Sequence, residues 1–145
     1  MDELDVGQKM KIRILTESEA KECFSVISEL RTHLGLDEFM ARIALQYKMG
    51  YFLVAVFDPD IVGVMGIRPV RTLARGWHLH VDDLVTTQDK RRSGIGSELL
   101  SFAEKYAKEE GMESIFLDSV PTALDFYSKH GFAPHTATLV RKKIK

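Results

Sequence analysis

The segment Asp83–Gly96 combines residue types that can hold a negatively charged ligand. Three consecutive basic residues, Lys90–Arg92, precede two glycines, Gly94 and Gly96, at the start of a helical pattern. The first turn of a helix leaves backbone N–H groups unpaired and carries the positive end of the helix dipole. Glycine lets the backbone approach a ligand closely. A strand, a basic loop and this helix start therefore favour a phosphate cradle over a solvated run of charges.

Two other phosphate-binding patterns fit this segment poorly. A P-loop needs Lys and then Ser or Thr after its second glycine, whereas Ser97 and Glu98 follow Gly96. The dinucleotide fingerprint needs a third glycine or an alanine for close helix packing, and Leu99 stands there. That fingerprint also starts almost directly on its strand, whereas a long basic loop intervenes here. Both patterns are therefore disfavoured.

A second set of polar residues lies on the expected strand Trp77–Thr86. Alternation puts His78, His80 and Asp82 on one face, unless a bulge intervenes. Such a face indicates a wet cavity in which a carboxylate or an imidazole could act as a base. A purely structural interpretation is equally compatible, because these groups could face solvent or pair with Arg68 or Arg75. The two histidines have no third ligand at suitable spacing, so we expect no metal site.

Length and composition indicate one domain, residues 1–145, with an ordinary core. Lysine plus arginine (20) nearly balance aspartate plus glutamate (21), which disfavours general nucleic-acid binding. The single cysteine, Cys23, cannot form a disulfide within the chain and suits a reducing compartment. No apolar run is long enough to span a membrane, and the N-terminus is acidic. We expect a soluble, cytoplasmic protein that binds neither nucleic acid nor membrane.

The elements that must position these residues follow from the hydrophobic pattern. It predicts an α+β fold in the order β-α-α-β-β-β-α-β-α-β-β, with helices flanking a mixed, partly antiparallel central sheet. The expected elements are a strand at 10–15, helices at 16–35 and 37–50, strands at 51–57, 61–70 and 77–86, a helix at 94–110, a strand at 114–118, a helix at 123–129 and a final strand pair or hairpin over 132–144.

This arrangement resembles the GNAT superfamily of N-acetyltransferases. The family's acyl-CoA signature runs Gln/Arg-x-x-Gly-x-Gly/Ala, and residues 91–96 (RRSGIG) match it in full. Asp83–Thr86 resembles the strand that precedes this signature. Residues 123–132 (ALDFYSKHGF) resemble the family's second landmark, a helix that ends Phe-Tyr-x-x-x-Gly-Phe. Two landmarks in the right order, separated by one helix and one strand, make the resemblance specific.

The resemblance implies transfer of an acetyl group from acetyl-CoA to a primary amine by direct attack, without a covalent enzyme intermediate. In this family two parallel strands splay apart and hold the thioester in the gap, and residues 77–86 and 114–118 would be those strands. The residues that it assigns to acetyl-CoA, mainly through their backbone, are Leu84, Val85, Thr86, Arg91, Arg92, Ser93, Gly94, Ile95, Gly96 and Ser97.

The resemblance also assigns catalytic roles. Tyr127 stands where many members place a tyrosine that protonates the departing thiolate, a role we favour over that of an ordinary buried aromatic. The Asp82-Asp83 pair resembles the paired acids of polyamine-type relatives, so Asp82, acting through water, is the first candidate base and His80 the second. Val120 occupies a position where many members have an asparagine that helps to hold pantetheine. The contact with pantetheine on that side must therefore differ in this chain.

Three questions stay open at this level. A non-catalytic CoA-binding or regulatory domain of the same fold is the alternative, and the presence of Tyr127 with a nearby base favours the enzyme. The sequence does not identify the amine acceptor, because its pocket is built from elements that vary freely within the fold. An exposed final strand could also pair across a homodimer.

Overall fold

A six-stranded sheet forms the centre of the protein, and its strands lie side by side in chain order. The structure is a computed structural model that describes residues 3–6 and 10–145. Each of the first four strands pairs antiparallel with the next, and the sixth joins the fifth in parallel. The strands are β1 (Glu3–Val6), β2 (Met10–Ile14), β3 (Phe52–Phe57), β4 (Ile61–Thr72), β5 (Gly76–Thr86) and β6 (Ser114–Leu117).

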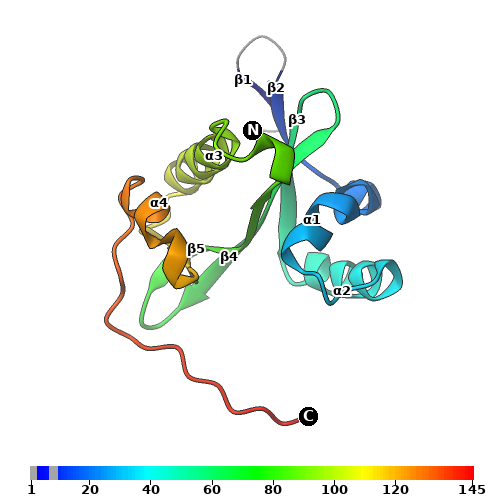
Figure 1. The fold of residues 1–145 in the computed structure, drawn as a ribbon. Coiled ribbons are helices and arrows are strands. Elements are labelled where there is room, and N and C mark those ends of the chain that lie inside the picture. Colours follow the sequence, from blue (N-terminus) through cyan, green and yellow to red (C-terminus); the bar gives the residue numbers. More distant parts are fainter. Residues whose placement is uncertain (1–2, 7–9) are drawn as a thin grey trace.

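Helices cover both faces of this sheet (Figure 1). The 3-10 helix η1 (Glu17–Cys23) leads into α1 (Phe24–Leu30), and α2 (Leu36–Lys48) lies beside it on one face. The helices on the other face are α3 (Ile95–Glu109), preceded by η2 (Gln88–Lys90), and α4 (Leu124–Ser128), preceded by η3 (Pro121–Ala123). This is the predicted α+β class. In the part of the chain that the structure describes, no helix is long and apolar enough to cross a bilayer.

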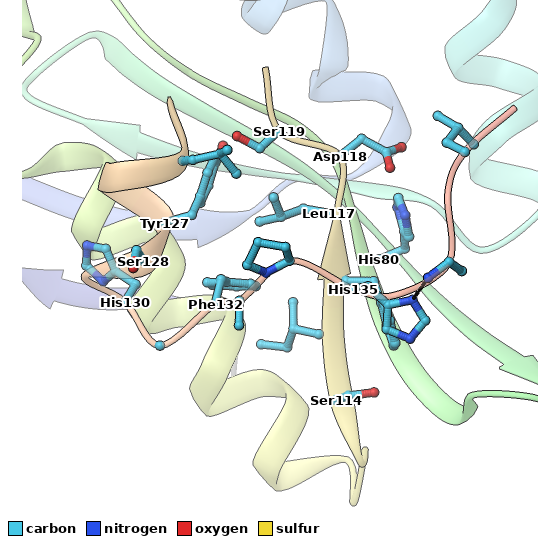
Figure 2. A pocket seen from close by; sticks show the side chains of 18 of the residues that line it. His80, Ser114, Leu117, Asp118, Ser119, Tyr127, Ser128, His130, Phe132 and His135 are labelled. Carbon is cyan, nitrogen blue, oxygen red and sulfur yellow. Dashed lines mark hydrogen bonds between the residues drawn. The ribbon is translucent and has the colours of Figure 1, made fainter. Parts of the chain in front are cut away.

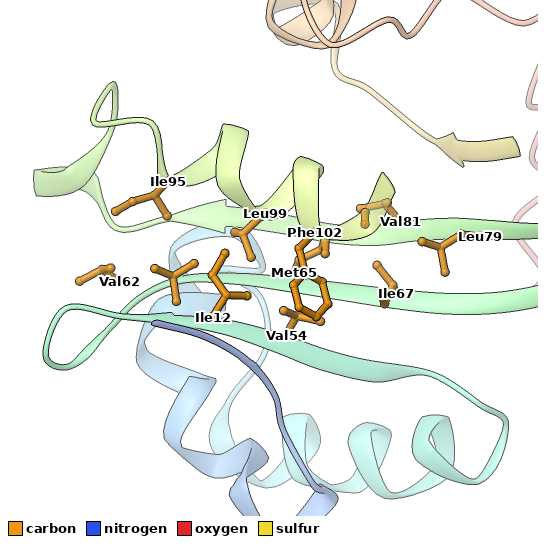
Figure 3. Close-up of a cluster of buried hydrophobic side chains, with 12 residues drawn as sticks. Ile12, Val54, Val62, Met65, Ile67, Leu79, Val81, Ile95, Leu99 and Phe102 are labelled. Atoms are coloured by element: carbon orange, nitrogen blue, oxygen red, sulfur yellow. The ribbon is translucent and has the colours of Figure 1, made fainter. Parts of the chain in front are cut away.

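Two apolar clusters join the helices to the sheet. In the first, the stripe predicted for residues 94–110 packs Ile95, Leu99 and Phe102 of α3 onto β4 and β5 (Figure 3). The second holds η1, α1 and α2 against the opposite face. Full burial of one such aliphatic or aromatic side chain stabilises a fold by roughly 1.5–3 kcal/mol. The sheet is therefore fixed from both sides along β3, β4 and β5.

β5 contains a β-bulge, because one of its residues has no pairing partner on β4. Gly66 and Ile67 are neighbours on β4, yet they pair with Asp83 and Val81, so Asp82 has no partner. Such a β-bulge reverses the alternation of side chains beyond it. Val81 belongs to the cluster beneath α3, whereas Asp83 forms its hydrogen bonds on the side of α1 and α2. The bulge therefore separates two neighbouring stretches of β5 that serve opposite faces.

The predicted final strand pair over 132–144 is wrong. Residues 133–145, all described by the structure, are exposed and contain no strand (Figure 1). A tight hairpin needs Gly, Asn or Asp at its turn, and residues 133–145 contain none of them. We call residues 133–145 the C-terminal arm. A further difference lies at the other end of the sheet, where β1 pairs with β2 although the sequence predicted no strand there.

Candidate active site

The two parallel strands separate as the resemblance implied. Pairing between β5 and β6 runs from His78↔Ser114 to Val81↔Leu117 and ends there. β5 continues to Thr86, and within the described residues no strand pairs with residues 82–86 on this side. Leu84, Val85 and Thr86 lie in this stretch, and their other edge is occupied by β4. A free strand edge can accept main-chain hydrogen bonds from an extended, amide-containing ligand.

The N-terminus of α3 opens beside this free edge. Gly94 precedes the helix with φ of 88°, a left-handed conformation that suits glycine. Arg92 also has positive φ, at 68°. The first backbone bond of the helix runs from the Glu98 N–H to the Gly94 carbonyl at 3.0 Å. No side chain of the described residues caps the N–H groups of residues 95–97, so they are available to an anion.

The basic loop is anchored by contacts that the sequence did not predict. The Gln88 N–H donates to Glu29 Oε1 at 3.0 Å, and the Arg91 guanidinium lies 3.8 Å from the same carboxylate. Arg91 Nε also donates to the Thr86 carbonyl at 3.3 Å. The Ser93 hydroxyl donates to the Lys90 carbonyl. Arg91 and Ser93 therefore hold the shape of the loop, in addition to any contact with a ligand.

The two glycines of the signature serve different needs. A Cβ atom at Gly94 would meet nothing within 4 Å, so the space beside this backbone is open. A Cβ atom at Gly96 would lie 3.1 Å from Phe126 Cζ, so this glycine lets α3 and α4 pack closely. The Ser97 hydroxyl lies 3.0 Å from His130 Nε2, at the end of α4. The sequence suggested a ligand for both glycines, and the structure adds a packing reason for Gly96.

A cavity of about 1090 Å³ lies along β6, between α4 and the C-terminal arm. Figure 2 shows Tyr127 and His80 on opposite sides of β6, and both line this cavity. The Tyr127 ring packs edge-on against Phe126 and Phe132. Burial raises the pKa of Tyr127, so its hydroxyl keeps its proton at neutral pH. The structure thus brings the predicted acid and the second candidate base to one cavity.

Asp82 is held by three hydrogen bonds. Arg68 donates to its two carboxylate oxygens at 2.8 and 3.1 Å, and His80 Nδ1 lies 2.9 Å from Oδ1. Burial raises the pKa of Asp82, but the hydrogen bonds from His80 and Arg68 outweigh it and lower the pKa to about 2. Asp82 is therefore ionised at neutral pH, and its oxygens are already engaged.

The two histidines of β5 have different environments. A carboxylate can only accept, so His80 Nδ1 donates this hydrogen bond, and Nε2 is the ring nitrogen that it leaves for another partner. His78, expected in the same wet cavity, is instead only 2% exposed. Its ring packs against Phe116, and its Nδ1 lies 3.0 Å from the Gly76 carbonyl. That part of the prediction is wrong, because β6 and its aromatic ring cover this position.

A smaller pocket of about 390 Å³ lies between β5 and the helices α1 and α2. Asp83 forms its inner wall, where it accepts from Tyr51 Oη at 2.7 Å and from Arg31 Nε at 2.9 Å. Gly66 makes room for the Tyr51 ring, because any Cβ there would collide with it. Arg42 also lines the pocket. The sequence missed these partners, since Arg31 is 52 positions from Asp83 and no local pattern links them.

Within residues 3–6 and 10–145, no group of three or more His, Cys, Asp or Glu side chains is arranged to hold an ion.

Comparisons of the sequence and of the fold with known proteins identify the family of this chain. The sequence model of the acetyltransferase (GNAT) family matches residues 15–132. An uncharacterized N-acetyltransferase of Bacillus subtilis (strain 168) is 31% identical over 109 residues, 74% of this chain and 77% of that protein. A glucosamine 6-phosphate N-acetyltransferase of Trypanosoma brucei brucei is 26% identical over 133 residues, 87% and 90% of the two chains. The crystal structure of a Trypanosoma brucei acetyltransferase superposes with a TM-score of 0.78 at 25% identity, over 92% of this chain and 99% of that one. The chain belongs to the acetyltransferase (GNAT) family.

Proposed function

We propose that this protein transfers an acetyl group from acetyl-CoA to a primary amine by direct attack on the thioester. The observation that carries the proposal is the convergence of Tyr127 and His80 on one cavity, at the point where β5 and β6 separate. The amine nitrogen forms a bond to the carbonyl carbon while the carbon–sulfur bond breaks. His80 Nε2 takes the proton that the amine loses, and Tyr127 gives its proton to the thiolate. The products are the acetylated amine and CoA, and solvent restores both side chains.

The residues present fit acetyl-CoA as the donor. In this proposal the free edge of β5 at Leu84–Thr86 binds the pantetheine amides. The uncapped N–H groups at the start of α3, with the open space beside Gly94, bind the pyrophosphate. Arg91 and Arg92 add positive charge beside it. Val120 has no side-chain hydrogen-bonding group, so backbone groups must bind pantetheine on that side.

We assign the base to His80 and a positioning role to Asp82. A carboxylate whose pKa is about 2 is a weak proton acceptor at neutral pH, and Arg68 already engages both of its oxygens. The imidazole of His80 lines the cavity, and among the described residues no hydrogen bond engages its Nε2. Asp82 fixes the tautomer that leaves Nε2 unprotonated, as orienting carboxylates do in other enzymes. The base is therefore the second of the two residues that the sequence singled out.

We assign the acceptor to the smaller pocket and expect a small amine that carries an anionic group. The pocket adjoins Asp82 and Asp83, and its walls also contain Arg31, Arg42 and His33. The carboxylates of Asp82 and Asp83 attract an ammonium group, and the guanidinium N–H groups that Arg31 and Arg42 do not use toward Asp83 and Glu38 can donate to an anion such as a phosphate. The relative named for glucosamine 6-phosphate acts on an acceptor of this class, which supports the choice.

Release of CoA from acetyl-CoA by the purified protein tests this function. The most informative acceptor pair is glucosamine 6-phosphate and glucosamine, which differ only in the phosphate. We expect a kcat/KM about 10-fold or more higher for the phosphorylated amine. No CoA release with any amine of a broad panel would favour the non-catalytic CoA-binding alternative, and equal rates for the pair would refute the anionic acceptor.

Two histidine variants separate chemistry from acceptor binding. His80→Gln should lower kcat by roughly 10²- to 10⁴-fold, the range of general acid–base groups. His33→Gln is the matched control, because His33 lines the acceptor pocket and is not among the residues that line the larger cavity. That change should raise the KM for the amine and leave kcat nearly unchanged. A His80→Gln enzyme with wild-type kcat would remove His80 from the mechanism.

A further inference from the structure

Asp82 lies in the bulge of β5 and has no strand partner on either side. The pairing with β4 passes over it, and the pairing with β6 ends one residue earlier, at Val81. A partly buried backbone carbonyl needs a hydrogen-bond donor, because leaving it unpaired costs about as much free energy as a lost hydrogen bond. The donor at this position comes from α1, since Arg31 Nη2 lies 2.9 Å from the Asp82 carbonyl oxygen.

The same guanidinium also holds the next residue of β5. Arg31 Nε donates to Asp83 Oδ1 at 2.9 Å, and Tyr51 Oη donates to the other oxygen of this carboxylate at 2.7 Å. A guanidinium is planar and presents its N–H groups in a fixed fork. Its two contacts therefore fix the Asp82 carbonyl and the Asp83 carboxylate relative to each other.

The backbone of Arg31 is itself fixed at the end of α1. Its N–H donates to the Ile27 carbonyl at 2.8 Å, and its carbonyl accepts from the Leu34 N–H at 3.1 Å. Ile27 is buried in the apolar cluster that joins α1 to the sheet. Asp83 is only 15% exposed, so water competes weakly for its contact with the guanidinium. Arg31 therefore holds the bulge from a well-packed helix end.

We propose that Arg31 is a positioning residue for His80. The inference rests on the proposed function, in which His80 Nε2 takes a proton from the amine. Asp82 binds His80 Nδ1 through its carboxylate and binds Arg31 through its backbone carbonyl. By fixing this backbone, Arg31 sets the place from which the Asp82 carboxylate reaches His80. His80 thereby keeps its orientation in the larger cavity (Figure 2), which Arg31 itself does not line.

A second arginine of the acceptor pocket provides a matched comparison. Arg31 and Arg42 both line the smaller pocket. Arg42 donates to Glu38 at 2.8 Å, one turn away on the same helix, and among the described residues no hydrogen bond or ion pair joins it to β5. Both arginines can therefore affect acceptor binding, but only loss of the Arg31 side chain should disturb the bulge.

Steady-state kinetics at saturating amine test the proposal. Arg31→Ala should lower kcat by roughly 10- to 100-fold, because a displaced catalytic group loses about this much, with little change in the KM for acetyl-CoA. Arg42→Ala should instead raise the KM for the amine and change kcat by less than about twofold. Arg31→Lys keeps the charge but lacks the fork that makes both contacts, so its kcat should stay low. A wild-type kcat in either Arg31 variant would overturn the proposal.

A double variant tests whether Arg31 acts through His80. If it does, Arg31→Ala should lower kcat no further in an enzyme that already carries His80→Gln, because the residue that it positions is gone. Additive losses of kcat would show that Arg31 acts on the reaction by another route and would overturn the proposal.

Nitrogen-15 NMR of the His80 ring reads the positioning without any activity. At about pH 8.5, where an ordinary imidazole is neutral, the wild type should carry the His80 proton on Nδ1. Arg31→Ala should shift part of the population to the Nε2–H tautomer, and Arg42→Ala should not. Arg31→Lys should give the same shift and serves if Arg31→Ala does not fold.

This measurement also separates the two levels of the argument. An unchanged His80 spectrum in a folded Arg31 variant would overturn the positioning role, whatever the activity of the protein. A protein that releases no CoA with any amine, but whose His80 spectrum responds to Arg31 and not to Arg42, would refute the proposed function and support the link between Arg31 and His80.

Discussion

The ion pair around Asp82 makes a measurable contribution to stability, and Asp82→Asn isolates it. The substitution keeps the size of the side chain and removes its charge. The pKa of Asp82 falls from an ordinary value of 3.8 to about 2, and one pKa unit corresponds to about 1.4 kcal/mol. The charged form is therefore favoured in the folded state by about 2 kcal/mol. This conversion applies because the side chain is only 23% exposed and its partners are in direct contact.

Asp82→Asn should lose this stabilisation, and the loss should depend on pH because folding lowers the pKa of Asp82. A carboxyl group whose pKa is lowered by folding stabilises the protein fully above its unfolded value, and this stabilisation disappears as pH falls toward the folded value. Wild type and Asp82→Asn should therefore differ by about 2 kcal/mol in the free energy of unfolding from pH 7 to about pH 4. The difference should shrink between about pH 4 and pH 2, where the wild-type carboxyl group also becomes neutral.

Urea denaturation at a series of pH values measures both quantities. Asp60→Asn provides the control, because Asp60 is exposed in the turn between β3 and β4. Its effect should stay within about 0.5 kcal/mol. A loss for Asp82→Asn that persists undiminished to pH 2.5 would show that packing, and not charge, is responsible. A loss below about 0.5 kcal/mol at pH 7 would mean that the contacts of Arg68 and His80 do not stabilise the carboxylate.

Three further predictions concern the cofactor and the acid. Tyr127→Phe should lower kcat by roughly 10- to 10³-fold with little change in the KM for acetyl-CoA, and a wild-type rate would reduce Tyr127 to a packing role. Gly94→Ala should weaken acetyl-CoA binding in calorimetry by about 10-fold, because a Cβ atom strains the left-handed backbone by about 1–2 kcal/mol and lets the free loop relax away from the conformation that binds the pyrophosphate. Gly111→Ala is its control, since Gly111 also has positive φ but lies at the far end of α3, and equal losses of affinity would contradict the cradle. Acetyl-CoA at 100 times its Kd should stabilise the fold by about 2.7 kcal/mol in thermal unfolding, and a larger shift with NAD would reject the assignment.

The sequence predicted the elements whose apolar pattern is long and regular. The helix expected at 94–110 is α3, Ile95–Glu109, because its buried residues recur every three or four positions. The strands expected at 51–57 and 61–70 are β3 and β4, whose central residues are almost all buried. In these segments the apolar residues of the sequence are the residues that the fold buries, so the pattern and the burial agree.

The sequence failed to predict the course of the C-terminal segment and the partners of Asp82 and Asp83, for two different physical reasons. The expected hairpin at 132–144 rested on β-forming composition alone, and composition does not supply the turn residue that a hairpin needs. The partners of Asp82 and Asp83 were missed because tertiary packing, and not local spacing, brings Arg31 and Tyr51 to β5. One weak signal was present in the sequence. Val81 and Leu84 are both apolar although they are three positions apart, and an odd spacing in an alternating strand indicates a bulge.

That bulge links the two halves of the candidate site. Before it, His80 lines the larger cavity along β6, and after it, Asp83 lines the pocket beside α1 and α2. Asp82 contacts both halves, because its carboxylate holds His80 and its backbone carbonyl accepts from Arg31 Nη2 at 2.9 Å. A regular strand would have placed Asp83 on the same face as Val81, within the apolar cluster, where an unpaired carboxylate is strongly destabilising. One extra residue in β5 thus keeps the charges out of the core, with Asp82 holding the proposed base His80 and Asp83 lining the proposed acceptor pocket.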